Sequence, residues 1–435
     1  MGNQPVVFLG SRSVICDLFE KRGRIYSSRP RMVMASEIMT HGDHVVFMPY
    51  GPQWRKHHRI QGALLNQQAV RHYRKLLDLE SLFTLRDILA KPDNIEKAFR
   101  RYPGSLMNTL AYGEPTVSHC DAPQLKQVEN IARAFADAVG AGHWLVDAFP
   151  ILKWFPNCVA PWNRYGEQIH QRTVQLFREK TTAAETAPSW NWVKHAKGEY
   201  KDEMSDHEFL YVIGVLYQAG VHVTVSTLRH LLFICCRYSV SVATAQRELD
   251  SVLAPDQLPT TEDLRSLPYV SAFIKEVLRW RPLTPIGMPH ASTEDDSYGG
   301  YHLPRGTVFI PNHWALDIDE LGGDSQDFRP ERWLQCGAPM INAFGFGRRV
   351  CPGQHLAQDA VSLLVSRLLW AFSFQSPDEL SSWGFEIDAS ILVPKPFRAN
   401  VTIRDERRKD TINHGWRDSD KDFNSILEQI GREMS

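Results

Sequence analysis

The sequence predicts a mainly α-helical protein with small β-sheets, and three observations support this fold class. Apolar residues recur at helical spacing through most of the segment 54–240. Short β-like runs, interrupted by Gly and Pro, occupy residues 285–311 and 385–403. The chain of 435 residues is 43% hydrophobic and 23% charged, as is typical of globular proteins. Because no repeat or linker is visible, we expect one domain over residues 1–435, with a charged, peripheral extension at about 404–435.

In the first half of the chain, local sequence patterns predict one short strand followed mainly by helices. Residues 5–10 are predicted to form a short strand and residues 13–22 a helix. Another helix is expected to begin near Trp54, and most of the chain as far as residue 240 follows it as helix. The polar segment 181–192 is predicted to be a loop.

A long, largely buried helix is predicted in the middle of the chain. Ser205 and Glu208 have the Ser-x-x-Glu spacing of a capping box, and apolar sequence follows to about Cys236. The apolar runs 209–221 and 231–236 are each shorter than the roughly 20 residues that span a bilayer. We therefore expect no membrane-spanning helix in this chain.

The second half alternates helices with irregular segments. Helices are expected at 243–253, 271–280 and 355–370, and Pro282 stops the second of them. The segment 317–343 is predicted to be a compact loop region.

Charge and cysteine content argue against several classes of protein. Lys and Arg number 49 and Asp and Glu 50, so the net charge is −1, and neither a nucleic-acid surface nor a polybasic membrane patch is expected. The seven cysteines include no Cys-x-x-Cys pair, which argues against a zinc ribbon or a thioredoxin-type centre. So few cysteines fit a reducing compartment better than secretion.

The strongest motif is the sequence FGFGRRVCPG at residues 344–353. Its three glycines allow positive φ angles and the close approach of a flat ligand. Cys351 lies just before a predicted helix, and a helix N-terminus favours thiolate over thiol. Arg349 supplies a cation suited to a carboxylate. Two other interpretations are a Gly-rich turn around a buried cysteine and a metal pair of Cys351 with His355, although two ligands do not complete a zinc site.

This loop resembles the haem loop of the cytochrome P450 family, Phe-x-x-Gly-x-Arg-x-Cys-x-Gly. The resemblance implies that haem b is the cofactor and that Cys351 is the axial ligand of its iron. A thiolate in that position favours O–O cleavage. Every fixed position of the family pattern is matched, by Phe344, Gly347, Arg349, Cys351 and Gly353.

Two further segments agree with the family pattern in order and spacing. Glu276 and Arg279 form its Glu-x-x-Arg element on a predicted helix, and Arg332 lies in the matching Phe-Arg-Pro-Glu-Arg-Trp segment 328–333. The resemblance implies a buried structural network of these three residues. Taken alone, an i,i+3 pair such as Glu276 and Arg279 is more often a surface ion pair.

The residues expected to hold the haem propionates match the family less closely. Trp54 begins a segment that resembles the family's Trp-x-x-x-Arg, but its fourth following position is His58, and Arg59 comes next. His290 lies where the family often has a propionate-binding His or Arg. The alternative interpretation of the 54–59 segment is a solvated basic helix start.

The main departure from the family lies in the predicted long helix. Ala219 and Gly220 match the oxygen-activation segment and imply a kinked or open helix, but His222 replaces its acid and Val223 its first alcohol. Thr224 keeps the next hydroxyl, and His222 can relay protons near neutral pH. Three interpretations follow. Substrate hydroxyls or water supply the protons, the enzyme catalyses a rearrangement that needs little acid chemistry, or catalysis is weakened.

The resemblance implies a haem-thiolate monooxygenase that oxidises a small apolar substrate. The segment 280–310 looks most similar to fungal microsomal members of secondary metabolism, such as those resembling O-methylsterigmatocystin oxidoreductase. Electrons would come from NADPH through NADPH-cytochrome P450 reductase, with cytochrome b5 as an optional donor, to a monomer. The alternatives are a non-oxygenating isomerase or cyclase and a truncated, impaired haem-binding protein.

Such family members usually begin with a membrane anchor, a Pro-rich hinge and a first helix and strand. Compared with them, this sequence starts after those elements. The resemblance implies a location at the cytosolic face of the endoplasmic reticulum. Without an anchor in the chain as given, the expected association is peripheral or the protein cytoplasmic.

Overall fold

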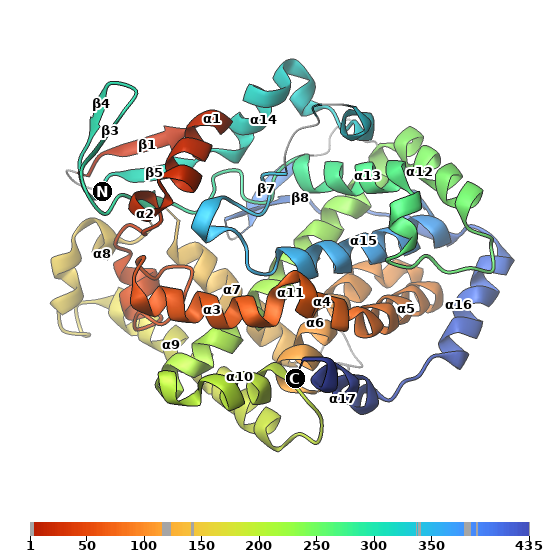
Figure 1. Ribbon diagram of the computed structural model, residues 1–435, viewed down its shortest axis with the longest axis horizontal. Coiled ribbons are helices and arrows are strands. Elements are labelled where there is room, and N and C mark those ends of the chain that lie inside the picture. The colour runs from red at the N-terminus through yellow and green to blue at the C-terminus, as the bar shows by residue number, and fades with distance from the viewer. Residues whose placement is uncertain are drawn as a thin grey trace.

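The computed structural model describes residues 4–114, 123–140, 143–335, 337, 341–377, 384–388 and 390–434. Two of the seven cysteines, Cys120 and Cys336, lie outside these residues. The described chain is mainly helical with small sheets, and the predicted fold class is confirmed (Figure 1).

Helices account for most of the described structure. Two short π-helices, at Cys16–Lys21 and Val33–Ile38, occur near the N-terminus. The α-helices are α1 (Arg12–Ile15), α2 (Gly23–Tyr26), α3 (Pro52–Leu65), α4 (Gln67–His72), α5 (Arg74–Ala90), α6 (Ile95–Tyr112), α7 (Pro123–Ala138), α8 (Leu145–Ala148), α9 (Pro161–Thr186), α10 (Trp192–Tyr200), α11 (Asp206–Arg237), α12 (Ser239–Val252), α13 (Pro268–Arg279), α14 (His313–Leu321), α15 (Gln354–Ala371), α16 (Glu406–Asp418) and α17 (Phe423–Met434).

The strands form small, separate sheets. In the largest, β1 lies parallel to β5, and β2 pairs antiparallel with the other edge of β5. The pairs β3–β4, β6–β9 and β7–β8 are antiparallel. Their bounds are β1 (Val6–Leu9), β2 (His290–Ala291), β3 (Asp296–Tyr298), β4 (Tyr301–Leu303), β5 (Val308–Pro311), β6 (Phe372–Gln375), β7 (Phe385–Asp388), β8 (Ile391–Pro394) and β9 (Asn400–Ile403).

The long helix α11 runs through the centre of the molecule (Figure 1). Ser205 caps it as predicted, because its hydroxyl accepts a hydrogen bond of 3.2 Å from the amide of Glu208. Helices α6, α7, α9, α13 and α15 all pack against it. Gly214 lets α9 approach closely, because a Cβ atom there would overlap the Phe177 ring. The two apolar runs of the sequence therefore belong to one core helix.

One described helix is long and apolar enough to span a membrane, and it is α11. However, 72% of its most apolar window is buried inside the protein. The apolar residues that make α11 long and apolar enough to span a membrane are therefore mostly residues of the protein core.

Two segments predicted as loops prove to be helical at their beginnings. Helix α9 continues to Thr186, because Phe177, Thr181 and Ala184 recur at helical spacing on its buried side. Helix α14 extends to Leu321, with Leu316 fully buried and the Asn312 side chain accepting from the amide of Ala315. Polarity alone misplaced both boundaries.

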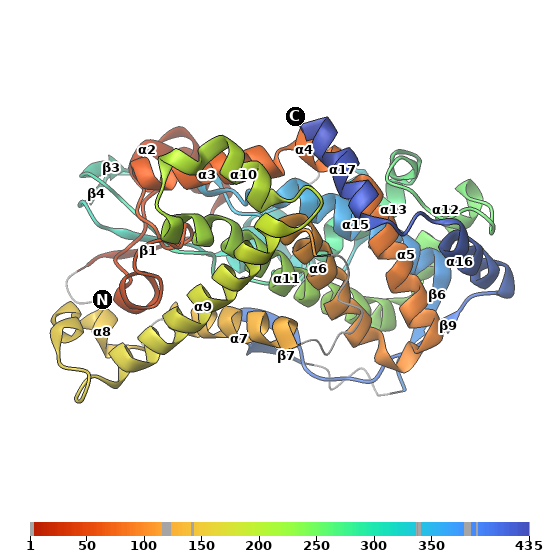
Figure 2. The same ribbon diagram turned by 90° about the horizontal axis from the view of Figure 1, so that it is seen from below.

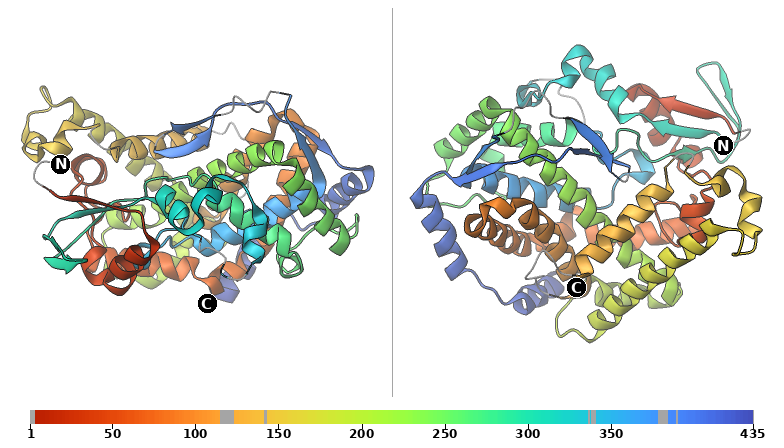
Figure 3. Two further views of the ribbon diagram at one scale, coloured as in Figure 1. Left: turned by 90° about the horizontal axis from the view of Figure 1, so that it is seen from above. Right: turned by 180° about the vertical axis from the view of Figure 1, so that it is seen from behind.

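The charged C-terminal segment is folded onto the core. Helices α16 and α17 contact α5, and α17 also contacts α4 (Figure 3, right). Ile412, Leu427 and Ile430 are buried, so each helix turns an apolar stripe inward. The C-terminal segment therefore packs against the helical core through its apolar residues and exposes its charged residues.

Glu276 is the centre of a buried polar network that joins α13 to the 3-10 helix Pro330–Leu334. Its carboxylate accepts from Nε and Nη2 of Arg279, both at 2.8 Å, and from Nε of Arg332 at 3.2 Å. The indole of Trp333 donates at 2.8 Å and the amide of Arg329 at 2.9 Å. Glu276 is fully buried, and these donors compensate its charge.

Removal of this carboxylate should destabilise the protein strongly. We expect Glu276→Ala to lower the free energy of unfolding by about 3–5 kcal/mol, because it leaves buried guanidinium groups without their partner. Urea denaturation of the cofactor-loaded protein, followed by tryptophan fluorescence, measures the change. The control is Glu406→Ala, which breaks an exposed i,i+3 pair with Lys409 and should change stability little. Equal stability of the two variants would show that the buried carboxylate of Glu276 does not stabilise the fold as proposed.

Candidate functional site

A cavity of about 460 Å³ lies beside α11 and the cysteine loop. Its walls come from α3, α6, α11, α13, α15 and the loop that precedes α15. Most of the predicted site residues meet here, from segments far apart in the sequence. They are Trp54, His58, Ala219, Gly220, Thr224, His290, Phe344, Arg349, Cys351 and Gly353.

The cysteine loop is held in shape by glycine and by backbone hydrogen bonds. The amide of Cys351 donates to the carbonyl of Phe344 at 2.9 Å and closes the turn. Gly347 has a φ of 56°, and a Cβ atom there would overlap the carbonyl of Phe19. Gly347, which is not among the cavity-lining residues, therefore serves to seat the loop against the N-terminal segment.

The sulfur of Cys351 lies at the end of the cavity where α15 begins. Burial raises the pKa of the thiol, and a hydrogen bond from the amide of Gly353 opposes that rise. The hydrogen bond to sulfur is the second-shell contact expected for a metal-bound thiolate.

Arg29, which is buried, and Arg349, which is half-buried, line the cavity and have no carboxylate partner among the described residues. Arg349 donates to the carbonyls of Ser27 and Met48, both at 2.8 Å, and of Val45 at 3.2 Å. Burial lowers its pKa to about 8. Arg29 likewise donates only to backbone carbonyls, and burial lowers its pKa to about 10.

Trp54 contacts both Arg349 and His58. The guanidinium carbon of Arg349 lies 4.4 Å from the centre of the Trp54 indole, a cation–π contact. The His58 ring stacks on the other part of the same indole, with ring centres 4.7 Å apart. His58 thus lies at the wall where the family pattern has arginine.

His290 lines the same end of the cavity but has one ring nitrogen committed elsewhere. Its Nδ1–H donates to the carbonyl of Tyr26 at 2.7 Å, and its ring stacks on Phe19 at 4.0 Å. Burial and the neighbouring Arg29 and Arg349 lower its pKa well below the ordinary value. The neutral ring therefore has Nε2 as its remaining polar atom.

The α11 wall differs in part from what the sequence suggested. The helix is continuous through Gly220, where a Cβ atom would meet Met107 of α6, so the small residue serves close packing. Val223 and Thr224 both line the cavity. His222 is not among the lining residues. Its Nε2 is buried without a partner in the described chain, and burial lowers its pKa.

Sequence reasoning missed Arg29, which has no local motif. Its partners are the carbonyls of Met288 and Pro289, about 260 residues away in the chain, and of Val46. In the sequence Arg29 is a basic residue in a short loop. Such residues are too common to indicate a binding site. Thr227, another cavity-lining hydroxyl, follows Thr224 by three residues, and helical periodicity could have found it.

The donor set fits a haem group. A thiol with a second-shell amide suits iron, and the uncompensated guanidinium groups of Arg29 and Arg349 suit the two propionates. The apolar remainder of the wall suits the macrocycle, with Leu356 and Ala360 on one side and Val215 and Leu216 on another. The fit rests on residues from the N-terminal segment, α11, the cysteine loop and α15.

Comparison with known proteins agrees with this chemistry. The family described as Cytochrome P450 matches residues 1–401. Cytochrome P450 monooxygenase aneD of Aspergillus aculeatus is 39% identical over 99% of this chain and 85% of its own length. Cytochrome P450 monooxygenase drtD of Aspergillus calidoustus is 37% identical over 97% and 82%.

A solved structure gives the same fold. A zebra fish cytochrome P450 structure with abiraterone has a TM-score of 0.76, covers 93% of this chain and 95% of its own, and is 23% identical. That likeness concerns the fold alone, while the sequence relatives and the family match extend across nearly the whole chain. The chain belongs to the cytochrome P450 family, and it is a monooxygenase of that family.

Proposed function

We propose that this monooxygenase oxidises an apolar, multi-ring or prenylated secondary metabolite at the Cys351 end of its cavity. The observation that carries the proposal is the composition of the cavity wall. It is predominantly aliphatic and offers few polar groups to a ligand: Leu106, Met107, Leu216, Val223 and Ile391. Such a wall selects substrates by shape and apolar contact.

The relatives support a fungal metabolite as the substrate class without naming it. One of them, from Aspergillus ruber, is described as echilunin cytochrome P450 monooxygenase and is 35% identical to this chain. The narrower likeness to O-methylsterigmatocystin oxidoreductase stays a prediction.

The proposed mechanism assigns each part of the site a separate task. Haem, when bound to a thiolate, supplies the activation of dioxygen and the transfer of one oxygen atom. Cys351 binds the iron, and the Gly353 amide holds the sulfur in position. Arg349 and Arg29 hold the carboxylates of the cofactor and fix its orientation. The apolar wall excludes water and holds one bond of the substrate toward the iron.

Proton delivery in the proposal relies on Thr224 and on water or substrate hydroxyls. Thr224 is a hydroxyl-bearing residue of the α11 wall, whereas the neighbouring Val223 has no polar atom in its side chain. His222 lies behind that wall, with its unpartnered Nε2 available to a buried water. A relay through His222 therefore needs at least one water between the ring and the cavity.

The proposed partners follow the family. NADPH-cytochrome P450 reductase supplies electrons, and cytochrome b5 is an optional donor. A location at the endoplasmic reticulum surface is supported by exposed apolar residues around α8, which Figure 2 shows at one end of the molecule beside the start of α9. These residues are Leu145, Phe149, Ile151, Trp154, Phe155 and Val159.

The ligand of the iron is tested by the carbon monoxide difference spectrum of the reduced protein. We expect a strongly red-shifted Soret band, because a thiolate is the proximal ligand. Cys351→His should keep haem and lose that shift, while Cys158→Ala, which changes an exposed cysteine, should leave the spectrum unchanged. A red-shifted band in Cys351→His would show that another group binds the iron.

The role of Arg349 is tested by haem affinity. Arg349→Leu should weaken haem binding about 10–100-fold, since a hydrogen bond to a charged group contributes about 1.5–3 kcal/mol. The haem content per chain after dialysis against a haem-binding protein measures the loss. Arg348→Ala is the matched control, because Arg348 is the adjacent cation and is not among the cavity-lining residues. Equal haem loss in both variants would remove Arg349 from the site.

The absence of a hydroxyl at position 223 should be visible in the coupling of the reaction. We expect Val223→Thr to lower severalfold the hydrogen peroxide released per NADPH oxidised with reductase present, because a second hydroxyl supplies protons. Thr224→Val should raise the same ratio. If neither variant changes the peroxide yield, the protons are supplied without help from this wall.

A further inference from the structure

Three histidines from distant segments meet on the side of α9, away from the haem cavity. His41 lies in the loop before α3, His170 on α9, and His207 in the first turn of α11. One ring nitrogen from each lies within 4.8 Å of the others. None of the three is among the described residues that line the cavity. Their meeting is therefore a separate feature of the fold.

Two of the histidines have their Nδ1 atoms held by hydrogen bonds. His207 Nδ1 donates to Asp43 Oδ2 at 2.6 Å, and His170 Nδ1 contacts the carbonyl of Met39 at 3.2 Å. Because these contacts use Nδ1, Nε2 is the ring nitrogen that each histidine can offer to a metal ion. In the described chain, Nε2 of His207 is buried and has no hydrogen-bond partner. A carboxylate or carbonyl on the far nitrogen is the usual arrangement behind a metal-binding histidine.

The third histidine is presented from a strained turn. His41 has a φ of 49°, in the left-handed region that a non-glycine residue seldom adopts. Its ring stacks on that of His170, with centres 3.7 Å apart. The turn is fixed by the amide of Gly42, which donates to the carbonyl of Ser36 at 2.8 Å.

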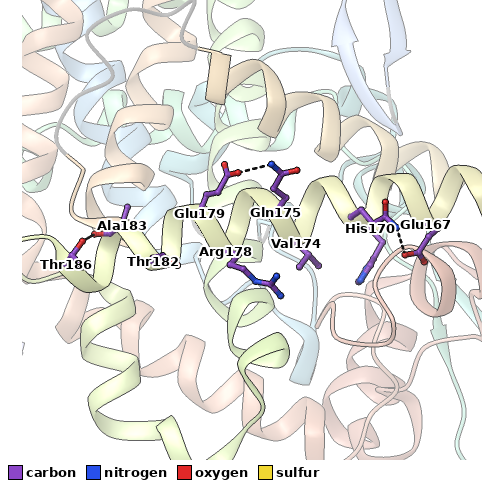
Figure 4. Close-up of a pocket in the computed structure, with 10 residues that line it drawn as sticks. Glu167, His170, Val174, Gln175, Arg178, Glu179, Thr182, Ala183 and Thr186 are labelled. Atoms are coloured by element: carbon purple, nitrogen blue, oxygen red, sulfur yellow. Dashed lines mark hydrogen bonds between the residues drawn. The ribbon is translucent and has the colours of Figure 1, made fainter.

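Carboxylates give the cluster the charge that a cation requires. Glu167 Oε2 lies 3.3 Å from Nε2 of His41, and Glu167 also accepts from Gln171 one turn along α9. Figure 4 shows Glu167 and His170 close together on α9, with His170 pointing toward the N-terminal segment drawn in faint red. With neutral histidines, Asp43 and Glu167 give the site two negative charges.

We propose that His41, His170 and His207 form a zinc site, with Glu167 as the fourth ligand and Asp43 as the residue that orients His207. Imidazole and carboxylate are the donors that zinc accepts in four-coordinate sites. Nitrogen ligands at about 2.0–2.1 Å from a tetrahedral ion lie about 3.4 Å from one another. The nitrogens now lie within 4.8 Å of one another, so zinc binding requires them to move closer together and the stacked His41 and His170 rings to turn their edges toward the ion.

The site would join the surface of the protein to the haem cavity through one loop. The residues that follow His41 include Val45 and Val46, which line the cavity. The carbonyls of Val45 and Met48 accept hydrogen bonds from Arg349. Zinc would thus fix the loop against α9 and α11. This last step rests on the proposed function, whereas the metal site itself does not.

Zinc binding is measured on the haem-loaded protein without a polyhistidine tag, after treatment with a chelator. Equilibrium dialysis against Zn²⁺ at pH 7.5, with elemental analysis, should show one tightly bound ion per chain. His41→Asn should lose that ion, because asparagine tolerates the left-handed backbone but is a poor zinc ligand. Asp43→Asn should weaken binding about 10–100-fold.

The matched control is His302→Asn, which changes an exposed histidine on β4 and should bind zinc as the parent protein does. Co²⁺ in place of zinc provides a second readout through its visible absorption, which should be that of a tetrahedral ion in the parent and absent in His41→Asn. Equal zinc uptake by the parent and by His41→Asn, or no tight ion in either, would overturn the proposal. The haem spectrum of each variant shows separately whether the fold and the haem site survive.

Discussion

The buried carboxylate of Glu276 is the interaction on which the rest of the structure depends. It is surrounded by donors from its own helix and from a segment more than 50 residues later in the chain. Arg279 extends the network to Asp317 and to the carbonyl of Ser325. A single charge therefore fixes the path of the chain between α13 and the approach to the cysteine loop.

The charges that line the cavity, unlike those around Glu276, lack oppositely charged partners among the described residues. Around Glu276 each charge has an oppositely charged partner, whereas in the described structure Arg29 has backbone carbonyls and Arg349 has backbone carbonyls and the Trp54 indole. Buried cations in such surroundings are unfavourable, as the lowered pKa values of both residues indicate. The charges around Glu276 are thus balanced within the protein. The charges of Arg29 and Arg349 would be balanced by the two propionates of a bound haem. The Glu276 network therefore supports the fold, and the two arginines belong to the part of the protein that binds the cofactor.

The sequence predicted the helical fold class, the cap of α11 and the cysteine loop, because each depends on residues close together in the chain. The loop boundaries at 181–192 and 317–343 were wrong, because burial on one helix face decided them and polarity did not. Arg29 was missed, since its partners come from remote segments. The family resemblance pointed to Ala219, Gly220 and Thr224 as residues of the wall, but it could not show that Val223 lines the cavity and that His222 does not. The meeting of His41, His170 and His207 had no signal in the sequence at all.

The unpaired guanidinium groups have a consequence for how much of this protein a cell contains. A cofactor that binds only the folded chain raises its stability in proportion to the logarithm of free cofactor over its dissociation constant. Because two cations lose their unfavourable environment in the same event, much of the folding free energy is linked to haem supply. Chains made faster than haem is delivered would populate open states and be removed by proteases. The steady-state level of the enzyme should then follow haem synthesis as closely as it follows transcription.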